Sequence, residues 1–566
     1  MKFTEIPYER ADLSAWKQMV EEQTARFLAA KTFEEADAVY QESENAAIDY
    51  DTMVSIARIR RDIDTRDAFY DGEVAYYNQE MPKLQASMIL WSKATLESPF
   101  RKQLEEKYGS ISFINAELAM KTFDPAIIGD LQKENALKSR YSKLIASAQI
   151  PFRGGVYTLS QLSPWKLDPD DEIRTAAWTA EGEWYNAHGQ ELDEIYDELV
   201  QLRHGMGVKL GYEDYKPLGY ARMKRNCYTE ADVEKFRIAV QRYLVPVAKK
   251  LYQAQAKRQG RDFPLNFADK DLAFRSGNPK PVGDPAQILE MGTRFYSELS
   301  PESKEFWSFM RQHEMMDVES KPGKAGGAYC TRVSKLRSPF IFANFNGTAH
   351  DVEVVTHEAG HAFAGFLNRF RVPASTMWPS LEGCEVHSMS MEFFAWPWAE
   401  GFFGEDTRKF RYNHLKGALV FIPYGTMVDH FQHVIYEHPD FSPEERHQVW
   451  RELLGIYMPW VKPGEIPFYG EGKGWQRQSH IYASPFYYID YCLAQTVALE
   501  FWAMIQEDPK KAFDTYLAYA KLGGTMTFTE LLKEAGLESP FEEETLRKVS
   551  QAANAYLEGY DLSGIE

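Results

Sequence analysis

The most constraining feature of this chain is the pentapeptide HEAGH at residues 357–361, which lies inside a mostly apolar stretch at residues 351–367. Positions i and i+4 of an α-helix lie on one face, about one turn apart. A helix here therefore presents the imidazoles of His357 and His361 side by side, at a spacing suited to one metal ion. Glu358 follows the first of these histidines and can reach a water on that metal. The apolar residues around the pentapeptide give the helix a side to bury.

A catalytic zinc site needs a third protein ligand in addition to the two histidines. Residues 380–394 read as a second helix, on which Glu382, Glu385 and Glu392 share one face. Sequence spacing favours Glu385, which is central on that face, but does not exclude Glu382, whereas His387 lies off the face. The H-E-x-x-H pattern with a later carboxylate is typical of zinc peptidases, in which the motif glutamate acts as general base.

Carboxylates that orient the metal-binding histidines are also expected, because such ligands usually donate their second N–H to a neighbour. Glu353 lies one turn before His357, and Glu392 lies two turns beyond Glu385. Either of the two carboxylates could accept the imidazole N–H, and the sequence does not choose between them.

At 566 residues the chain exceeds a single ordinary core, so two or more lobes are expected. Most of it has helical spacing of apolar residues, and the clearest β segment is at residues 321–347, directly before the HEAGH helix. Residues 258–284 and 459–491 are rich in Pro, Gly or aromatic residues and are predicted to be irregular, the second as an active-site loop. We therefore expect a mainly α protein with one small β-sheet beside the HEAGH helix.

Charge and targeting signals exclude several classes of protein. The net charge of −19 and the absence of a Lys/Arg run argue against nucleic-acid binding. The four cysteines form no C-x-x-C pair, so a disulfide framework is not expected. The N-terminal residues contain no apolar secretory segment, and no apolar run of membrane-spanning length is present. A cytoplasmic protein without membrane partners is the expectation, and the sequence gives no oligomeric state.

Several stretches resemble one known family. They are HEAGHAF from residue 357, EVHSMSME from residue 385, PFIFANFNG from residue 339, and HIY from residue 480 followed by FYY from residue 486. These segments are similar to the oligoendopeptidase F and thimet oligopeptidase family of zinc metallopeptidases, and within it to the bacterial oligoendopeptidase F and Pz-peptidase group. The matching segments lie between about residues 205 and 500, whereas the first 200 residues match only in helical character.

The resemblance implies a fold and a set of site residues. The fold is two helical lobes around a deep channel, and we divide the chain into an N-terminal helical region (1–200) and a catalytic region (201–566). One zinc ion per chain is held by His357, His361 and Glu385, and Glu358 is the general base. The transition state is bound by His480, Tyr491 and a third residue, for which Tyr482 is preferred over Tyr487 and Tyr488. The substrates are oligopeptides.

Three functions remain open from the sequence. The preferred one is a zinc endopeptidase for short peptides. The second is a carboxypeptidase or dipeptidyl carboxypeptidase, for which Arg332, Lys335 or Arg337 could bind the terminal carboxylate. The third is a catalytically silent peptide-binding protein, and the presence of Glu358 argues against it, because such a protein has no use for a base.

Overall fold

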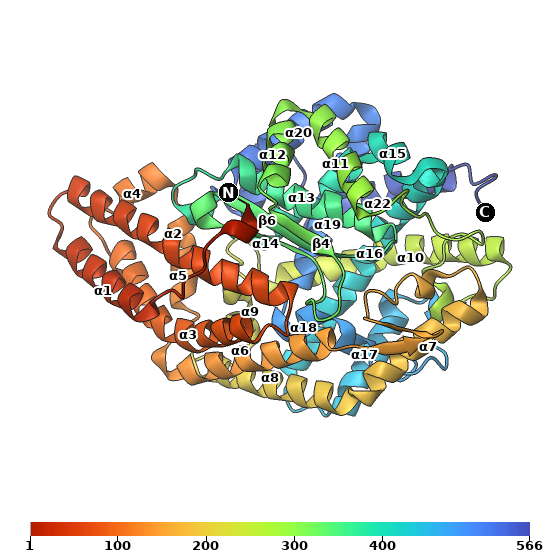
Figure 1. Ribbon diagram of the computed structural model, residues 1–566, viewed down its shortest axis with the longest axis horizontal. Coiled ribbons are helices and arrows are strands. Elements are labelled where there is room, and N and C mark those ends of the chain that lie inside the picture. Colours follow the sequence, from red (N-terminus) through yellow and green to blue (C-terminus); the bar gives the residue numbers. More distant parts are fainter. Residues whose placement is uncertain (1) are drawn as a thin grey trace.

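The computed structural model describes residues 2–566, and helices make up most of it (Figure 1). The N-terminal part is a group of helices with long apolar faces, and several begin at an aspartate or threonine whose side chain accepts a backbone N–H, as Asp12 does for α1. These helices are α1 (Leu13–Ala29), α2 (Phe33–Ile63), α3 (Ala68–Leu96), α4 (Arg101–Tyr108), α5 (Ile111–Met120) and α6 (Ile128–Ala146).

The next part of the chain adds further helices and ends in a long helix with a capping box at Thr229. They are α7 (Asp171–Ala187), α8 (Gly189–Lys209), α9 (Lys216–Arg222) and α10 (Glu230–Gln259). A short antiparallel pair, β1 (Ile150–Phe152) with β2 (Gly155–Tyr157), precedes them. A second short pair, β3 (Leu265–Asn266) with β7 (Val461–Lys462), is parallel. It joins the two segments that the sequence predicts to be irregular.

The C-terminal part contains the remaining helices, and α13, α14, α16 and α19 form its centre. The helices are α11 (Pro285–Leu299), α12 (Pro301–Gln312), α13 (His350–Leu367), α14 (Leu381–Phe394), α15 (Ala399–Phe403), α16 (Thr407–Glu437), α17 (Pro443–Tyr457), α18 (Ser479–Ala483), α19 (Tyr488–Glu507), α20 (Pro509–Leu522), α21 (Phe528–Glu534) and α22 (Glu543–Glu558).

One three-stranded sheet lies beside α13, in the order β4-β6-β5. β4 (Met316–Glu319) is parallel to β6 (Ser338–Phe345), and β5 (Tyr329–Val333) is antiparallel to it, with Thr331 opposite Phe340. β6 is the central strand and is buried over nearly its whole length, and β4 and β5 are the edge strands. The prediction of a mainly α fold with a small sheet before the HEAGH helix is confirmed.

Apolar packing is divided between two large cores. Helices α1–α5 enclose a core of their own, which includes Trp16, Tyr40 and Trp91. A second core extends from α6 to the C-terminus, contains the sheet and the central helices, and also includes Phe3, Ile6, Ile56 and Ile59. The division at residue 200 stays a prediction. Within residues 2–566 no helix is both long and apolar enough to cross a membrane.

Candidate metal centre

Helix α13 begins directly after the buried strand β6, and a tight turn fixes this junction. The carboxylate of Asp351 accepts the backbone N–H groups of Asn346 and Gly347 at 2.9 and 2.7 Å. Gly347 has a φ of +85°, which glycine adopts without steric cost. The junction therefore sets the direction of α13 relative to the sheet.

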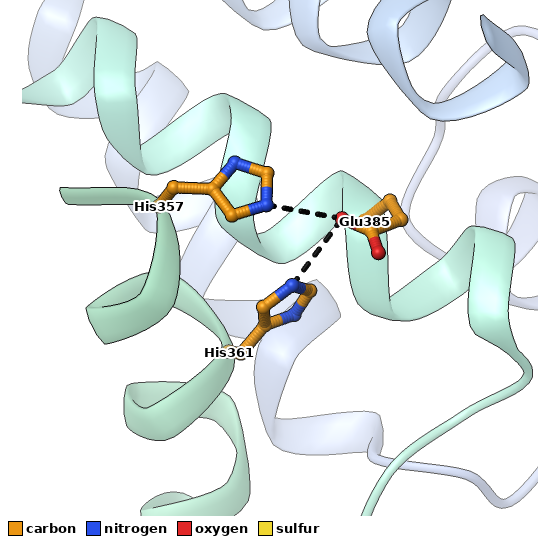
Figure 2. A group of neighbouring side chains, drawn as sticks. All are labelled: His357, His361 and Glu385. Atoms are coloured by element: carbon orange, nitrogen blue, oxygen red, sulfur yellow. Dashed lines mark ion pairs between the residues drawn. The ribbon is translucent and has the colours of Figure 1, made fainter. Parts of the chain in front are cut away.

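The three predicted ligands lie together between α13 and α14 (Figure 2). Oε2 of Glu385 lies 3.2 Å from Nε2 of His357 and 3.2 Å from Nε2 of His361. One ligand atom from each residue lies within 4.8 Å of the other two. Glu385 is almost fully buried, so its carboxylate faces the histidines rather than solvent. Two nitrogens and one oxygen converge on a point that a small cation can occupy.

The close packing of α13 against α14 depends on Gly360. A Cβ at this position would lie 2.7 Å from the backbone oxygen of His387 and 2.7 Å from Cα of Ser388. Contacts this short require a backbone to move, so only glycine allows the two helices to approach this closely. The approach brings Glu385 within reach of the histidines.

A chain of hydrogen bonds orients His357 through Nδ1, the ring nitrogen that does not face Glu385. Its Nδ1 lies 2.7 Å from one oxygen of Glu392, and the other oxygen lies 2.8 Å from Nε2 of His414. The indole N–H of Trp396 donates to Nδ1 of His414 over 3.0 Å, so a neutral His414 carries its proton on Nε2 and donates it to Glu392. Glu392 thus accepts on both oxygens, and Nε2 of His357 is left free to bind a metal.

Ionisation of Glu392 fits this role. Burial raises the pKa of its carboxyl, but the hydrogen bonds from His357 and His414 lower that pKa to about 2. Glu392 is therefore charged at neutral pH. The sequence did not decide whether Glu353 or Glu392 hydrogen-bonds to His357, and in the structure it is Glu392 that does. Glu353 instead lies 3.7 Å from Nδ1 of His350.

Glu358 lies next to the two histidines in sequence and lines the same cavity as His357. Its side chain is buried, and its Oε2 has no hydrogen-bond partner within residues 2–566. Burial raises the pKa of its carboxyl, and the neighbouring imidazoles of His357 and His361 lower it less. A buried carboxylate oxygen without a partner, beside a candidate metal site, is available to accept a proton from a bound water.

Aromatic residues from the segment 459–491 complete the site. The predicted irregular loop is wrong for its last part, because His480 lies on α18 and Tyr491 in the first turn of α19. Nε2 of His480 lies 3.2 Å from the hydroxyl of Tyr491. The hydroxyl of Tyr487 donates to Oε1 of Glu385 over 2.7 Å, and the rings of Tyr487 and Tyr491 stack with centroids 5.0 Å apart. The structure thus brings His480, Tyr487 and Tyr491 together at the carboxylate of Glu385.

Comparison with known proteins identifies the family. Residues 3–123 match the peptidase M3 N-terminal domain, and residues 304–551 match peptidase family M3. A solved structure described as Pz peptidase A is 43% identical, with a TM-score of 0.97, and the match covers 99% of this chain and 100% of the other. The chain belongs to peptidase family M3.

Further relatives of this M3 chain agree with that result. A structure named as oligoendopeptidase F from Bacillus anthracis is 40% identical, with a TM-score of 0.93, over 99% of each chain. Among curated proteins, oligopeptidase PepF of Bacillus subtilis is 25% identical over 42% of this chain. The oligoendopeptidase F homolog of Borreliella burgdorferi is 25% identical over 40% of this chain. The matched part spans only 36% and 40% of the length of these two curated relatives.

Tyr482 does not lie at the site of this M3 chain, and the preference for it over Tyr487 is not supported by the structure. Its side chain is fully buried, its ring stacks on Tyr141 with centroids 4.0 Å apart, and its hydroxyl donates to the backbone oxygen of Leu192. The reason is helix α18, on which His480 and Tyr482 are two residues apart and therefore point to opposite sides. The spacing of four between Tyr487 and Tyr491 was the available signal.

Glu382, the alternative third ligand, also lies elsewhere. It is buried in the first turn of α14, and its carboxylate accepts from the hydroxyl of Ser380. Burial raises the pKa of this carboxyl. Within residues 2–566 the candidate metal cluster of this M3 chain contains Glu385 and not Glu382.

A cavity of about 560 Å³ opens at the metal centre of the M3 chain. One wall is the HEAGH side of α13, with His357 and Glu358, and another is a stripe of α16 from Asn413 to Phe421. This volume is large enough for several amino-acid side chains, so the cavity gives a peptide access to the metal centre.

Proposed function

We propose that this chain is a zinc-dependent endopeptidase that hydrolyses internal bonds of oligopeptides. One observation carries the proposal: the three candidate ligands converge beside Glu358, whose buried Oε2 has no partner. A purely structural metal site has no need for such a free base. Membership in peptidase family M3 and the relatives named oligoendopeptidase support the same activity.

The residues fit a zinc ion. Two imidazole nitrogens and one carboxylate oxygen are the ligand set of many catalytic zinc sites, which keep one position open. The histidines have their Nε2 atoms directed at Oε2 of Glu385, and Glu392 fixes the tautomer of His357. When bound, zinc would polarise a substrate carbonyl and lower the pKa of a water ligand. We expect one zinc ion per chain.

Glu358 is the proposed general base and acid. Its free carboxylate oxygen accepts the proton of the attacking water and later passes it to the leaving amine. Burial raises the pKa of Glu358, which makes it a stronger base than an exposed glutamate. A base whose pKa is closer to the working pH transfers protons more efficiently in both directions.

His480 and Tyr491 are proposed to stabilise the charge that develops on the substrate carbonyl oxygen, whereas Tyr487, which donates its single hydroxyl proton to Glu385, is proposed to position that ligand. Burial raises the pKa of Tyr487 and of Tyr491 well above the usual value, so both keep their protons; Tyr487 donates its proton to Glu385, and that of Tyr491 is available to the substrate. Burial lowers the pKa of His480 to about 4, so this ring is neutral at pH 7 and holds a single N–H. Fixed donors that face a developing oxyanion favour the transition state over the bound substrate.

The edge strand β5 is proposed to bind the backbone of the substrate. It has no strand partner on its outer side within residues 2–566, and Ala328, next to β5, lines the metal cavity. The preceding loop is fixed to β6 by Asn344, whose amide donates to the backbone oxygens of Ala325 and Gly327. An extended peptide can add to such an edge through main-chain hydrogen bonds.

The three basic residues that could have bound a terminal carboxylate in a carboxypeptidase have other contacts. Arg332 contacts Asp51 at 3.1 Å and the backbone oxygen of Ala374 at 2.9 Å. Lys335 is exposed and pairs with Asp49 at 3.0 Å. Arg337 stacks on an exposed Phe370, with the guanidinium carbon 5.0 Å from the ring centre. None of the three lines the metal cavity.

The test is the Glu358→Gln variant with an internally quenched peptide that is blocked at both ends. The wild-type protein is expected to contain one zinc per chain and to cut the blocked peptide, which an exopeptidase cannot do. The variant is expected to keep zinc and lose turnover by orders of magnitude, because glutamine cannot accept the proton. Substantial turnover by a zinc-loaded variant would assign the base to another residue.

A further inference from the structure

A second cavity adjoins the metal cavity and has no role in the mechanism described above. Its volume is about 330 Å³, and it shares Gly417, Val420 and Phe421 of α16 with the metal cavity. These residues follow one face of the helix at spacings of three and four, so a single stripe of α16 passes from one cavity to the other. We call the second cavity the side pocket.

Aromatic rings form most of the walls of the side pocket. They come from segments far apart in sequence, among them α10, α16, α17 and the loop after α17. The aromatic lining residues are Tyr252, Phe267, Phe421, Tyr424, Trp450, Trp460, Tyr469 and Tyr488. Such walls favour a bulky apolar side chain over water.

The side pocket also contains an arginine without an acidic partner. Arg477, at the end of η9 (Gly474–Arg477), is exposed although it lies deep in the fold, because the space it faces is the pocket. Its guanidinium donates one long hydrogen bond, 3.4 Å, to the hydroxyl of Tyr469 and lies 5.9 Å from the centres of the Trp178 and Tyr469 rings. Within residues 2–566 no carboxylate oxygen lies within 4.0 Å of Arg477, and the neighbouring Glu181 is already ion-paired with Lys166.

The charge of the side pocket differs from that of the metal cavity and of the whole protein. Arg477 and Lys270 line the side pocket, and its acidic lining residue is Asp271, which pairs with Lys270. Arg477 therefore leaves one positive charge uncompensated inside a protein whose net charge is −19. A guanidinium with free donors is best satisfied by a carboxylate, which accepts two parallel hydrogen bonds from it.

The side pocket is connected to the proposed catalytic loop. Gln478, the neighbour of Arg477, lies with its amide nitrogen 3.1 Å from Nδ1 of His480 and accepts from the hydroxyl of Tyr424. Tyr488 lines the side pocket, and its ring packs against His480 with centroids 5.1 Å apart. The side pocket therefore borders both the metal cavity and the segment that carries His480.

We propose that the side pocket is a substrate subsite in which Arg477 binds a carboxylate of the peptide, next to a bulky apolar side chain held by the aromatic walls. This inference rests on the proposed peptidase function. The carboxylate has two possible sources, the C-terminus of the peptide and an acidic side chain. In the first case the cut lies at a fixed number of residues from the free C-terminus. In the second case the cut position follows the acidic residue.

The test uses two pairs of internally quenched peptides with an aromatic residue near the cut. One pair differs only in a free C-terminal carboxylate or a C-terminal amide, and the other, amidated, differs only in one Glu or Gln. The wild-type protein is expected to have about 10-fold or higher kcat/KM for the carboxylate member of one pair, as a charge-assisted hydrogen bond supplies. Arg477→Gln is expected to remove this preference, so that its kcat/KM values for the two members of the pair lie within about twofold of each other.

Two further variants make the result specific. Arg477→Lys keeps the charge but not the two parallel donors, so it is expected to keep only part of the preference. Arg294→Gln removes an exposed arginine on α11, paired with Glu298, and is expected to change nothing. Melting temperatures check that every variant folds. If Arg477→Gln does not fold, Arg477→Lys decides, since an undiminished preference in that variant overturns the proposal.

The outcome separates the subsite from the proposed function. If wild type cuts the peptides without preference in either pair, or if Arg477→Gln keeps the preference, the subsite is wrong and the peptidase function stands. If wild type cuts none of the peptides, the peptidase function fails. The subsite is then tested by fluorescence anisotropy of the same peptides on the full-length Glu358→Gln protein. Equal binding of both members of each pair there would overturn it.

Discussion

Replacing Glu392 by glutamine is expected to weaken zinc binding strongly although Glu392 is not a ligand. The carboxylate accepts from Nδ1 of His357 at 2.7 Å and from Nε2 of His414 at 2.8 Å. Glutamine has one acceptor oxygen and one amide group that donates. Because Trp396 holds the His414 proton on Nε2, the amide would face another donor. One of the two hydrogen bonds is therefore lost whichever way the amide turns.

The size of the effect follows from the bond that is lost. A hydrogen bond to a charged group contributes about 1.5–3 kcal/mol. If this energy orients His357 for the metal, its loss lowers the zinc affinity about 10- to 150-fold. Loss of a hydrogen-bond partner behind a metal-binding histidine typically costs about 10- to 100-fold in metal affinity.

The assay is a zinc titration at pH 7.5 against a fluorescent chelator, with a melting curve for each protein. Glu353→Gln is the matched control, because Glu353 also lies on the cavity wall near the histidines but pairs with His350 rather than His357. The control is expected to bind zinc like wild type. Equal zinc affinity in Glu392→Gln and Glu353→Gln would refute the proposed role of Glu392.

Three further predictions follow from the site and its surroundings. Glu385→Ala is expected to lose zinc and Glu382→Ala to keep it, and equal zinc content in the two purified variants would move the third ligand elsewhere. Tyr491→Phe is expected to lower kcat about 10²- to 10³-fold with zinc retained, as for loss of one oxyanion donor, and a similar fall in Tyr482→Phe would contradict this assignment. Burial lowers the pKa of His447 from 6.5 to about 4, so unfolding takes up a proton between these pH values. The contribution of His447 to stability is complete above pH 6.5 and falls by about 2 kcal/mol at pH 5. The melting temperature of His447→Leu is therefore expected to fall less than that of wild type between pH 7.5 and pH 5. An equal fall in the two proteins would contradict the lowered pKa of His447.

The parts of the site that depend on one helix could be predicted from the sequence. His357 and His361 are one turn apart, and this spacing is fixed by helix geometry wherever the helix lies. Glu385 needed in addition the correct face of α14, which the spacing of its acidic residues favoured. The choice between Glu353 and Glu392 could not be made, because it depends on how α13, α14 and α16 pack together.

The positions of the tyrosines after His480 could not be predicted, for a different reason. Tyr482 was preferred over Tyr487 and Tyr488 on the resemblance, but the short helix α18 directs Tyr482 into the core. Phe486, directly before Tyr487, has a φ of +67°, a backbone conformation that sequence spacing does not show. The parallel pairing of β3 with β7 joins segments nearly 200 residues apart, so it also leaves no local signal.

Gly360 has a consequence for any attempt to move this centre into another scaffold. The motif leaves the fourth position of the pentapeptide open, yet here a Cβ would lie 2.7 Å from the backbone of α14. A transplanted helix that carries both histidines and the glutamate, but faces a neighbour at ordinary spacing, would hold its third ligand too far away. The smallest fragment that could transfer the metal site to another scaffold is therefore the pair α13 and α14 with their backbone contact. A designer who copies only the pentapeptide should obtain a two-ligand site that binds zinc weakly and leaves the metal poorly positioned.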